Sequence, residues 1–262
     1  MKLCASNIGW TAEYDEYVYR FMAGSGFEGL EIAPSRIFPD STYEHVQEAS
    51  EFAANLRGNY GLPVVSMQSI WYGMTQRIAG SERERLELME HTRKALRFAD
   101  ALSCRNVVFG CPKNRKTEKP GDYETVTRFM ADIADEAEKF GITVALEPNP
   151  AIYGTNFINT TAQALELVSR LNHPALKVNL DFGTVIANAE TLSLIPGNIS
   201  LISHVHISEP ELMPLKPGRQ HTELRDVLKA SGYSGYISLE MRSQENISVL
   251  IGALQYMREV FA

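Results

Sequence analysis

Charged and imidazole side chains stand at the ends of four short apolar segments in the second half of the chain. Three of these segments end in Glu147, Asp181 and Glu240, and the fourth carries His206 near its end. A charged group at the end of an apolar segment is costly unless it is paired or coordinated. Three carboxylates brought close together would repel one another, and a cation would remove that repulsion. The residue types therefore predict a site for one divalent metal ion. Its donors suit Mn²⁺, Mg²⁺ or Co²⁺, and Zn²⁺ is a further option.

His204 lies two positions before His206, in the run Ser-His-Val-His-Ile. Residues two apart on a strand point to the same face and lie about 6.6 Å apart along it. We expect His206, which is nearer to the end of the strand, to be the metal ligand. We expect His204 one layer deeper, where it touches a substrate or supports the ligands. Taken singly, each strand-end residue has an ordinary structural explanation, but the four together favour a metal.

Three earlier apolar segments also end in polar residues that could contact a substrate. These residues are Asn7, Glu31 and Gln68. We expect them to complete the wall of the same pocket.

Basic residues in two loops are candidates to bind a phosphate or a carboxylate of the substrate. Lys113, Arg115 and Lys116 follow one apolar segment, and Arg219 follows another. Solvated loop charges are the simpler explanation for the first three, while Lys113 and Arg219 are kept as substrate-binding candidates. His221 is either a residue at the start of a helix or a pocket residue.

The candidate residues stand after short β-branched runs that alternate with helical patterns. The predicted strands are Lys2–Asn7, Gly29–Ala33, Val64–Gln68, Asn106–Gly110, Thr143–Glu147, Lys177–Asp181, Ser203–Ile207 and Ile237–Glu240. The clearest helical patterns between them are Ser81–Leu102, Tyr123–Phe140, Thr161–Leu171 and Asn246–Phe261. Ser81 with Glu84 three residues later is a capping box. Glycines typical of helix ends are Gly26, Gly61, Gly141 and Gly232.

Strands that alternate with helices predict right-handed parallel βαβ units of the α/β class. Eight such units in 262 residues favour a single closed (β/α)₈ TIM barrel over an open sheet. No linker or shift in composition divides the chain, so we expect one domain over residues 1–262. The active site of such a barrel lies at the carboxyl ends of its strands, where the predicted ligands stand.

The composition excludes several other classes of protein. Hydrophobic residues make up 44% and charged residues 22% of the chain, which is typical of a globular domain rather than a disordered, collagen-like or coiled-coil protein. The net charge of -7 disfavours a nucleic-acid partner, because an acidic surface repels phosphates. Three cysteines without a CxxC pattern, no long apolar stretch and no visible signal peptide predict a cytoplasmic protein that does not bind membranes.

The runs Leu-Glu-Pro at 146–148, Leu-Asp-Phe-Gly at 180–183, His-Val-His at 204–206 and Leu-Glu at 239–240 resemble the xylose-isomerase-like barrel family. That family includes ketose 3-epimerases, hydroxypyruvate isomerase, inosose dehydratase and endonuclease IV. The resemblance implies that Glu147, Asp181, His206 and Glu240 hold one divalent metal ion. It also implies a metal-dependent isomerase or epimerase whose partner is a small molecule, a sugar or a sugar phosphate.

The two glutamate ligands suggest how such an enzyme would work. Glu147 and Glu240 come from the fifth and eighth strands and would flank a hydroxy-ketone on opposite faces. The metal would polarise the carbonyl and the neighbouring hydroxyl, which acidifies the C–H between them. One glutamate would remove that proton to give an enediolate, and the other glutamate, or the same one, would return a proton. Return on the opposite face is epimerisation, and return to the neighbouring carbon is isomerisation.

Three positions depart from the family's pattern. Thr184 stands where the family often has a histidine, Tyr153 where the ketose epimerases have a further glutamate, and Leu212 where an arginine is expected. The metal site is therefore expected to carry over, but the known sugars are not. The alternatives are an inosose-type dehydratase on the same metal site and a non-catalytic ligand-binding barrel. Endonuclease IV is disfavoured because its zinc cluster needs further histidines. A homo-oligomer is compatible with the sequence.

Overall fold

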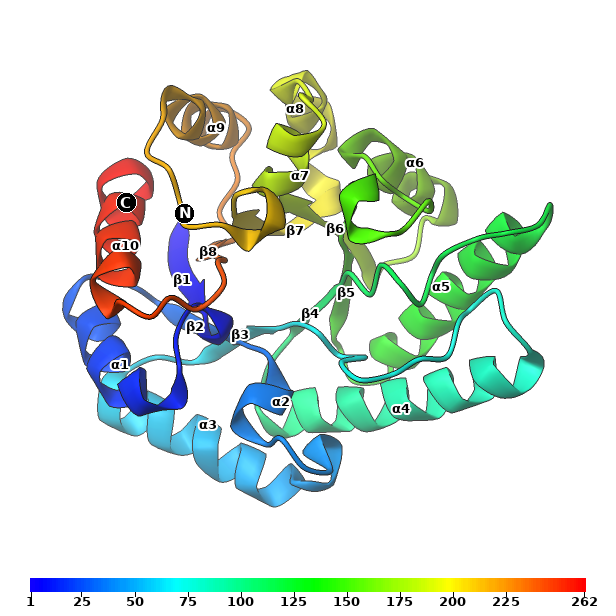
Figure 1. Cartoon of the computed structure of the whole chain (residues 1–262), viewed down its shortest axis with the longest axis horizontal. Helices are drawn as coiled ribbons and strands as arrows, with labels where there is room; N and C mark the ends of the chain where they lie inside the picture. The colour runs from blue at the N-terminus through cyan, green and yellow to red at the C-terminus, as the bar shows by residue number, and fades with distance from the viewer.

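Eight parallel strands form a closed barrel in the computed structural model, which describes residues 1–262 (Figure 1). The strands are β1 (Lys2–Ser6), β2 (Gly29–Ile32), β3 (Val64–Met67), β4 (Asn106–Phe109), β5 (Thr143–Leu146), β6 (Leu176–Asp181), β7 (Ile202–Ile207) and β8 (Tyr236–Leu239). Each begins and ends within one residue of the range predicted from the sequence. The predicted α/β class and the (β/α)₈ barrel are confirmed.

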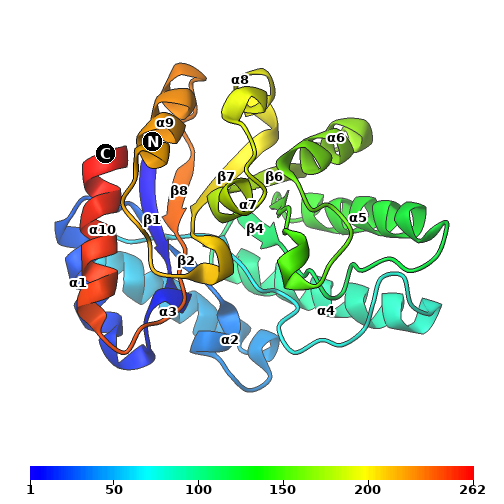
Figure 2. The same ribbon diagram turned by 45° about the horizontal axis from the view of Figure 1, so that its top comes forward.

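Helices lie between the strands and form the outer ring of the barrel (Figures 1 and 2). The longer helices are α1 (Asp15–Gly24), α3 (Val46–Tyr60), α4 (Glu82–Ala101), α5 (Asp122–Glu138), α6 (Thr161–Leu171), α9 (Arg219–Ala230) and α10 (Ile247–Phe261). The short helices are α2 (Pro34–Ile37), α7 (Phe182–Ala187) and α8 (Ile195–Asn198). Single 3₁₀ turns span Asn7–Gly9, Ala12–Tyr14, Thr42–Glu44, Ala151–Tyr153, Leu192–Leu194, Ile199–Leu201 and Pro210–Leu212.

Local signals in the sequence decide where the outer helices start and stop. The side chain of Ser81 accepts a hydrogen bond from the N–H of Glu84, and the Glu84 carboxylate accepts one from the N–H of Ser81 at 2.7 Å. This capping box begins α4 as predicted. The glycines predicted at helix ends all have positive φ, between +63° and +80°, which glycine adopts without steric penalty. They are Gly26, Gly61, Gly141 and Gly232.

The inside of the barrel carries a hydrogen-bonded polar layer, whereas a TIM-barrel interior is usually filled by branched apolar residues. β1 pairs in parallel with β8 and so closes the barrel. Inside it, the Nδ2 of Asn106 donates to the Oγ of Ser66 at 3.1 Å, and the Nε2 of Gln68 donates to the Oγ of Ser6 at 2.8 Å. Paired polar groups therefore lead from the core up to the carboxyl ends of the strands.

The first strand and the last helix lie side by side. α10 packs against β1 and α9, as both views show (Figures 1 and 2). None of the helices combines the length and the apolar character that a membrane span requires.

Candidate active site

Four acidic and imidazole side chains converge at the carboxyl end of the barrel. Asp181 is the last residue of β6 and His206 lies in β7, while Glu147 and Glu240 directly follow β5 and β8. One donor atom of each lies within 4.8 Å of the donor atoms of the other three. The structure thus brings together the four residues that the sequence predicts as metal ligands.

His206 faces carboxylates on both sides of its ring and is fully buried. Its Nδ1 lies 3.1 Å from Oε1 of Glu147 and 3.1 Å from Oε2 of Glu240, yet it hydrogen-bonds to neither. Its Nε2 lies 3.0 Å from Oε2 of Glu31, deeper in the barrel. A metal-binding histidine usually donates its second ring N–H to a carboxylate or carbonyl. The Nδ1 of His206 and the carboxylate oxygens that face it therefore fit coordination of a cation on this side of the ring.

The carboxylates around this point shift the pKa values of the whole cluster. Burial, together with the charges of Glu147 and Glu240, raises the pKa of Asp181 to about 7. Burial alone would lower the pKa of His206, but the charges of Glu31 and Glu240 raise it well above its usual range. Burial likewise opposes ionisation of Glu147, but its contact with His206 lowers its pKa. The cluster holds an excess of negative charge that protons or a cation must balance.

Asp181 is held by hydroxyl and amide groups from two elements. Its Oδ2 accepts a hydrogen bond from the N–H of Thr184 at 2.8 Å, and the Thr184 hydroxyl lies 2.6 Å from the same oxygen. Its Oδ1 accepts a hydrogen bond from the hydroxyl of Ser208, which in turn accepts one from the N–H of Gly183 at 2.9 Å. Position 184 therefore supports a candidate ligand in this chain and is fully buried beneath it.

Three of the predicted substrate-binding residues lie below or beside the pocket rather than on its surface. The Nε2 of His204 lies 2.9 Å from Oε2 of Glu31, and both side chains are buried. Asn7 is also buried, and its Oδ1 accepts a hydrogen bond from the N–H of Ala33 at 2.8 Å, which braces the ends of β1 and β2. Gln68 does line the pocket, and its Nε2 also donates to Glu31 at 3.2 Å.

A pocket of about 170 Å³ opens above the four converging residues. Besides Glu147, Asp181 and Glu240, its wall includes Gln68, Val108, Pro112, Asn149, Tyr153 and Leu212. The Oη of Tyr153 accepts a hydrogen bond from the N–H of Glu211 at 2.8 Å. Glu211 and Leu212 have φ of +60° and +54°, in a region that residues other than glycine rarely adopt. This turn places Leu212 against the pocket.

The two basic substrate-binding candidates do not line the pocket. Lys113 is exposed. Arg219 begins α9, is 91% exposed, and pairs with Glu223 at 2.8 Å. His221 is a buried residue of α9 whose Nδ1 lies 3.2 Å from the Oη of Tyr256, so it packs α9 against α10.

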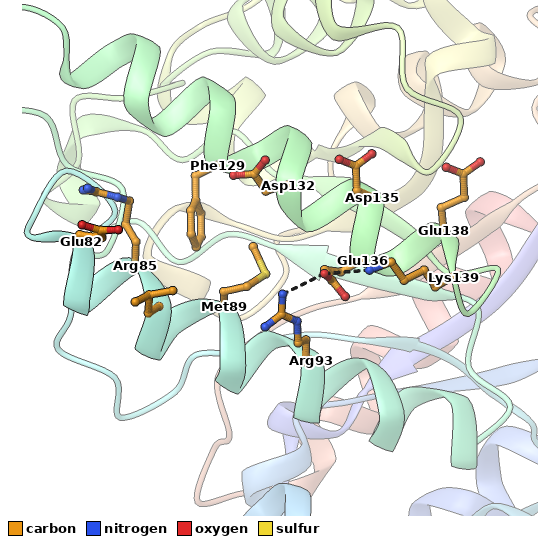
Figure 3. Close-up of a pocket in the computed structure, with 11 residues that line it drawn as sticks. Glu82, Arg85, Met89, Arg93, Phe129, Asp132, Asp135, Glu136, Glu138 and Lys139 are labelled. Carbon is orange, nitrogen blue, oxygen red and sulfur yellow. Dashed lines mark hydrogen bonds and ion pairs between the residues drawn. The ribbon is translucent and has the colours of Figure 1, made fainter.

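A larger hollow of about 880 Å³ lies on the outside of the barrel, between α4 and α5 (Figure 3). Its walls are mostly charged, and the Glu136 carboxylate there accepts from Arg93 at 3.0 Å and pairs with Lys139 at 2.9 Å. None of the residues predicted for the site lines this hollow. The pocket at the strand ends is therefore the candidate site.

Sequence analysis missed the two asparagines that hold Glu147, and the contact of Arg115 with one of them. The Nδ2 of Asn179 donates to its Oε1 at 2.8 Å, and the Nδ2 of Asn149 donates to its Oε2 at 2.8 Å. The Nη2 of Arg115 donates to Oδ1 of Asn149 at 2.7 Å. Arg115 is fully buried, so the expectation of a solvated loop charge is wrong for this residue. Asn149 offered a signal, because it lies two residues beyond a strand-end glutamate, but the path of the loop that holds Arg115 could not be predicted.

Comparison with known proteins relates this architecture to one family of barrels. Residues 19–260 match the family described as xylose isomerase-like TIM barrel. The chain is also similar to a ketose 3-epimerase of Arthrobacter globiformis, with 34% identity over 105 residues. That stretch is 40% of this chain and 35% of the epimerase, so the match spans about a third of the relative's length.

Two solved structures share the whole fold. One is the 3-keto-D-glucoside 4-epimerase YcjR from E. coli, with a TM-score of 0.78, 20% identity and 99% of both chains covered. The other is a protein of Brucella melitensis described as an AP endonuclease of family 2, with a TM-score of 0.77, 23% identity and all of both chains covered. At these identities the similarity shows a common fold.

Proposed function

The chain belongs to the xylose isomerase-like TIM barrel family, and we propose that it is a divalent-metal-dependent isomerase or epimerase of a small keto sugar. Two proteins to which it is similar are named as epimerases of keto sugars. The observation that carries the proposal is the convergence of Glu147, Asp181, His206 and Glu240 beneath one pocket.

The donors around His206 support a cation in this position. The buried Nδ1 of His206 makes no hydrogen bond and faces oxygens of Glu147 and Glu240. Three carboxylates and one imidazole suit Mn²⁺, Mg²⁺ or Co²⁺, and Zn²⁺ is a further option. When bound, the cation would polarise the ketone and the adjacent hydroxyl of the substrate.

Glu147 and Glu240 are the proposed proton-transferring groups. They follow β5 and β8, and both line the pocket. With a hydroxy-ketone between them, one carboxylate removes the proton from the carbon next to the carbonyl, and an enediolate results. The other glutamate, in its protonated form, delivers a proton to the enediolate, while the first keeps the proton that it removed. Return to the opposite face inverts that carbon, whereas return to the neighbouring carbon moves the carbonyl.

The pocket favours a single neutral sugar over a sugar phosphate or a nucleic acid. No lysine or arginine is among the lining residues, so nothing there would neutralise a phosphate. Its volume of about 170 Å³ is below the roughly 300–1,000 Å³ of sites for drug-sized ligands. Val108, Pro112 and Leu212 form an apolar part of the wall against which the C–H face of a sugar can pack.

The cysteines suit a reducing compartment such as the cytoplasm. Cys4, Cys104 and Cys111 are all unpaired, and the first two are buried. Disulfides are rare in such compartments.

The proposal predicts exchange of a carbon-bound hydrogen with solvent. Purified protein loaded with Mn²⁺ is incubated with a panel of neutral ketoses in D₂O, and NMR reports deuterium at the carbon next to the carbonyl. We expect exchange with at least one ketose, and its loss by about 10²-fold or more in Glu147→Gln and Glu240→Gln, the usual range for removal of a general acid or base. Glu166→Gln, which changes an exposed carboxylate of α6 away from the pocket, is the matched control and should keep the wild-type rate.

The same experiment separates the alternatives. Loss of water from the substrate would instead indicate the dehydratase. Tight binding of a sugar without exchange would indicate a ligand-binding barrel. Near-normal exchange in both glutamine variants would refute the assignment of Glu147 and Glu240.

A further inference from the structure

Arg115 is a buried cation in the loop between β4 and α5. Its side chain is fully buried and is the largest such side chain in the protein. Its Nη2 donates one hydrogen bond, to Oδ1 of Asn149 at 2.7 Å, while its Nε and Nη1 make none within the protein. Burial lowers the pKa of Arg115 to about 10 and the charge of Glu147 opposes that fall, so the guanidinium stays charged near neutral pH.

This arrangement stabilises the fold poorly. A buried donor without a partner carries the full penalty of its lost hydration, and the penalty is larger for a charged group. Arg115 has two such nitrogens, and its one hydrogen-bond partner is the neutral amide of Asn149. An apolar side chain of similar length would fill the same space without that penalty. The role of Arg115 is therefore inferred from its contact with Asn149 rather than from the stability of the fold.

Arg115 fixes which way the Asn149 amide faces. A guanidinium only donates hydrogen bonds, so the Asn149 group turned toward it must be the oxygen. The Nδ2 of Asn149 then faces Glu147, where it donates to Oε2 at 2.8 Å. The backbone of Asn149 is also fixed, because its N–H donates to the carbonyl of Ile158 at 3.1 Å and its carbonyl accepts from the Nδ2 of Asn159 at 2.8 Å.

Without the guanidinium, the Asn149 side-chain amide could flip, so that its Oδ1 and Nδ2 exchange positions. Its oxygen would then face Oε2 of Glu147, and two acceptors would repel each other. The Nδ2 of Asn179 would still hold Oε1 at 2.8 Å, so the carboxylate of Glu147 would pivot about that contact. Apart from the hydrogen bond to Glu147 itself, the contact with Arg115 is the one described for this amide side chain that opposes the rotation.

We propose that Arg115 is a positioning residue, which orients the Asn149 amide and thereby holds the Glu147 carboxylate in place for proton transfer. The proposal rests on the function proposed above for Glu147. It assigns Arg115 no contact with the substrate, since Arg115 is buried and does not line the pocket.

The test is a double-mutant cycle of Arg115→Met and Asn149→Ala, with Arg36→Met as the matched control. Arg36 is a partly buried arginine at the same end of the barrel, but it is tied to Asp15 and to the carbonyl of Trp10. Four quantities are measured: kcat and KM on the ketose found by exchange, Mn²⁺ affinity by calorimetry, and the melting temperature of the metal-free protein.

We expect Arg115→Met to lower kcat about 10- to 100-fold, as small misplacements of a catalytic group do, and to change KM much less. Mn²⁺ affinity should fall several-fold, while the melting temperature stays level or rises. In the Asn149→Ala background, Arg115→Met should lower kcat no further, because Arg115 acts through that amide. Arg115→Lys should restore part of the loss, and it replaces Arg115→Met in the cycle if the methionine variant does not fold.

Two results would overturn the proposal. One is a kcat of Arg115→Met that equals that of Arg36→Met. The other is a full additional loss in the Asn149→Ala background. If the wild type neither binds Mn²⁺ nor exchanges hydrogen, the proposed function fails instead. A crystal structure of Arg115→Met then tests the positioning role of Arg115 independently of activity. A Glu147 carboxylate in its wild-type position would contradict that role.

Discussion

His206 connects two layers of carboxylates inside the barrel. On one side its Nδ1 faces Glu147 and Glu240, and on the other its Nε2 lies 3.0 Å from Glu31. Glu31 also lies 2.9 Å from His204, so one buried carboxylate serves both histidines. A carboxylate behind a histidine ligand fixes the ring's tautomer and orientation. The role proposed for Glu31 and His204 is therefore to support the ligands rather than to touch the substrate.

Replacement of Glu31 by glutamine should weaken metal binding. The variant loses the negative charge that favours a proton on the Nε2 of His206. The Nδ1 of the ring then becomes a weaker electron-pair donor to a metal ion. Loss of such a supporting group usually weakens metal affinity by about 10- to 100-fold. Calorimetric titration with Mn²⁺ measures the effect. Glu190→Gln is the control, because that carboxylate is also hydrogen-bonded, to the N–H of Thr161 at 3.1 Å, but lies outside the site. Equal Mn²⁺ affinities for the two variants would contradict a role of Glu31 in metal binding.

Sequence analysis could predict the site residues whose place follows from their position on a strand. Glu147, Asp181 and Glu240 stand at strand ends, so the closed barrel alone brings them together. The positions of Lys113 and Arg115 depend on the path of a loop. Hydrophobic periodicity and secondary-structure propensity do not determine that path. One of these two neighbours is exposed and the other is buried beside Glu147.

At the scale of elements, the end of β4 must leave room for the end of β5. Gly110 directly follows β4, and a Cβ built on it would lie 2.7 Å from Oε2 of Glu147 and 3.4 Å from Oδ1 of Asn149. The two strands pair in register up to Phe109 and Leu146, so this approach is set by the sheet. Glycine at position 110 is thus a condition for the placement of Glu147.

Gly110→Ala should lower activity with little effect on folding. The methyl group would push the Glu147 carboxylate away, and kcat should fall about tenfold or more. Gly58→Ala is the matched control. Gly58 lies inside α3 with nothing within 4 Å of the added Cβ, so alanine there should stabilise the protein by about 0.5–1 kcal/mol and leave kcat unchanged. Kinetics and urea unfolding of both variants check this, and an unchanged kcat in Gly110→Ala would contradict it.

The elements differ in how well the sequence predicts them. Strands and long helices repeat their period over several residues and carry caps, as in the capping box of α4. The 3₁₀ turn Pro210–Leu212 carries no such signal, because Glu211 and Leu212 are poor candidates for positive φ. Its shape depends on tertiary contacts, among them the Tyr153 hydroxyl and the N–H of Arg242, which donates to the carbonyl of Leu212 at 2.9 Å.

Across the whole molecule, the acidic cluster makes stability depend on pH. The pKa of Asp181 is raised from 3.8 to about 7, so the metal-free folded state binds more protons than the unfolded chain between these values. Its stability must fall as pH rises through that window. The raised pKa of His206 acts in the same direction above pH 6.5. The lowered pKa values of Glu31 and Glu147 act only below about pH 4.5.

The melting temperature of the EDTA-treated protein should therefore fall between about pH 5.5 and about pH 8. Saturating Mn²⁺ should reverse this trend, because a cation replaces the protons and binds better as they leave. Asp181→Asn, which cannot ionise, should show a smaller slope in EDTA. Scanning calorimetry at several pH values checks all three, and equal slopes for the wild type and Asp181→Asn would argue against a raised pKa.

The converging donors come from four neighbouring strands, β5 to β8, and their supporting carboxylate comes from β2 on the far side of the barrel. A nascent chain cannot complete this set until β8 has been synthesised and has joined β1. Ion uptake would therefore accompany the last stage of folding, and partly folded intermediates would compete poorly for scarce trace metals in the cell.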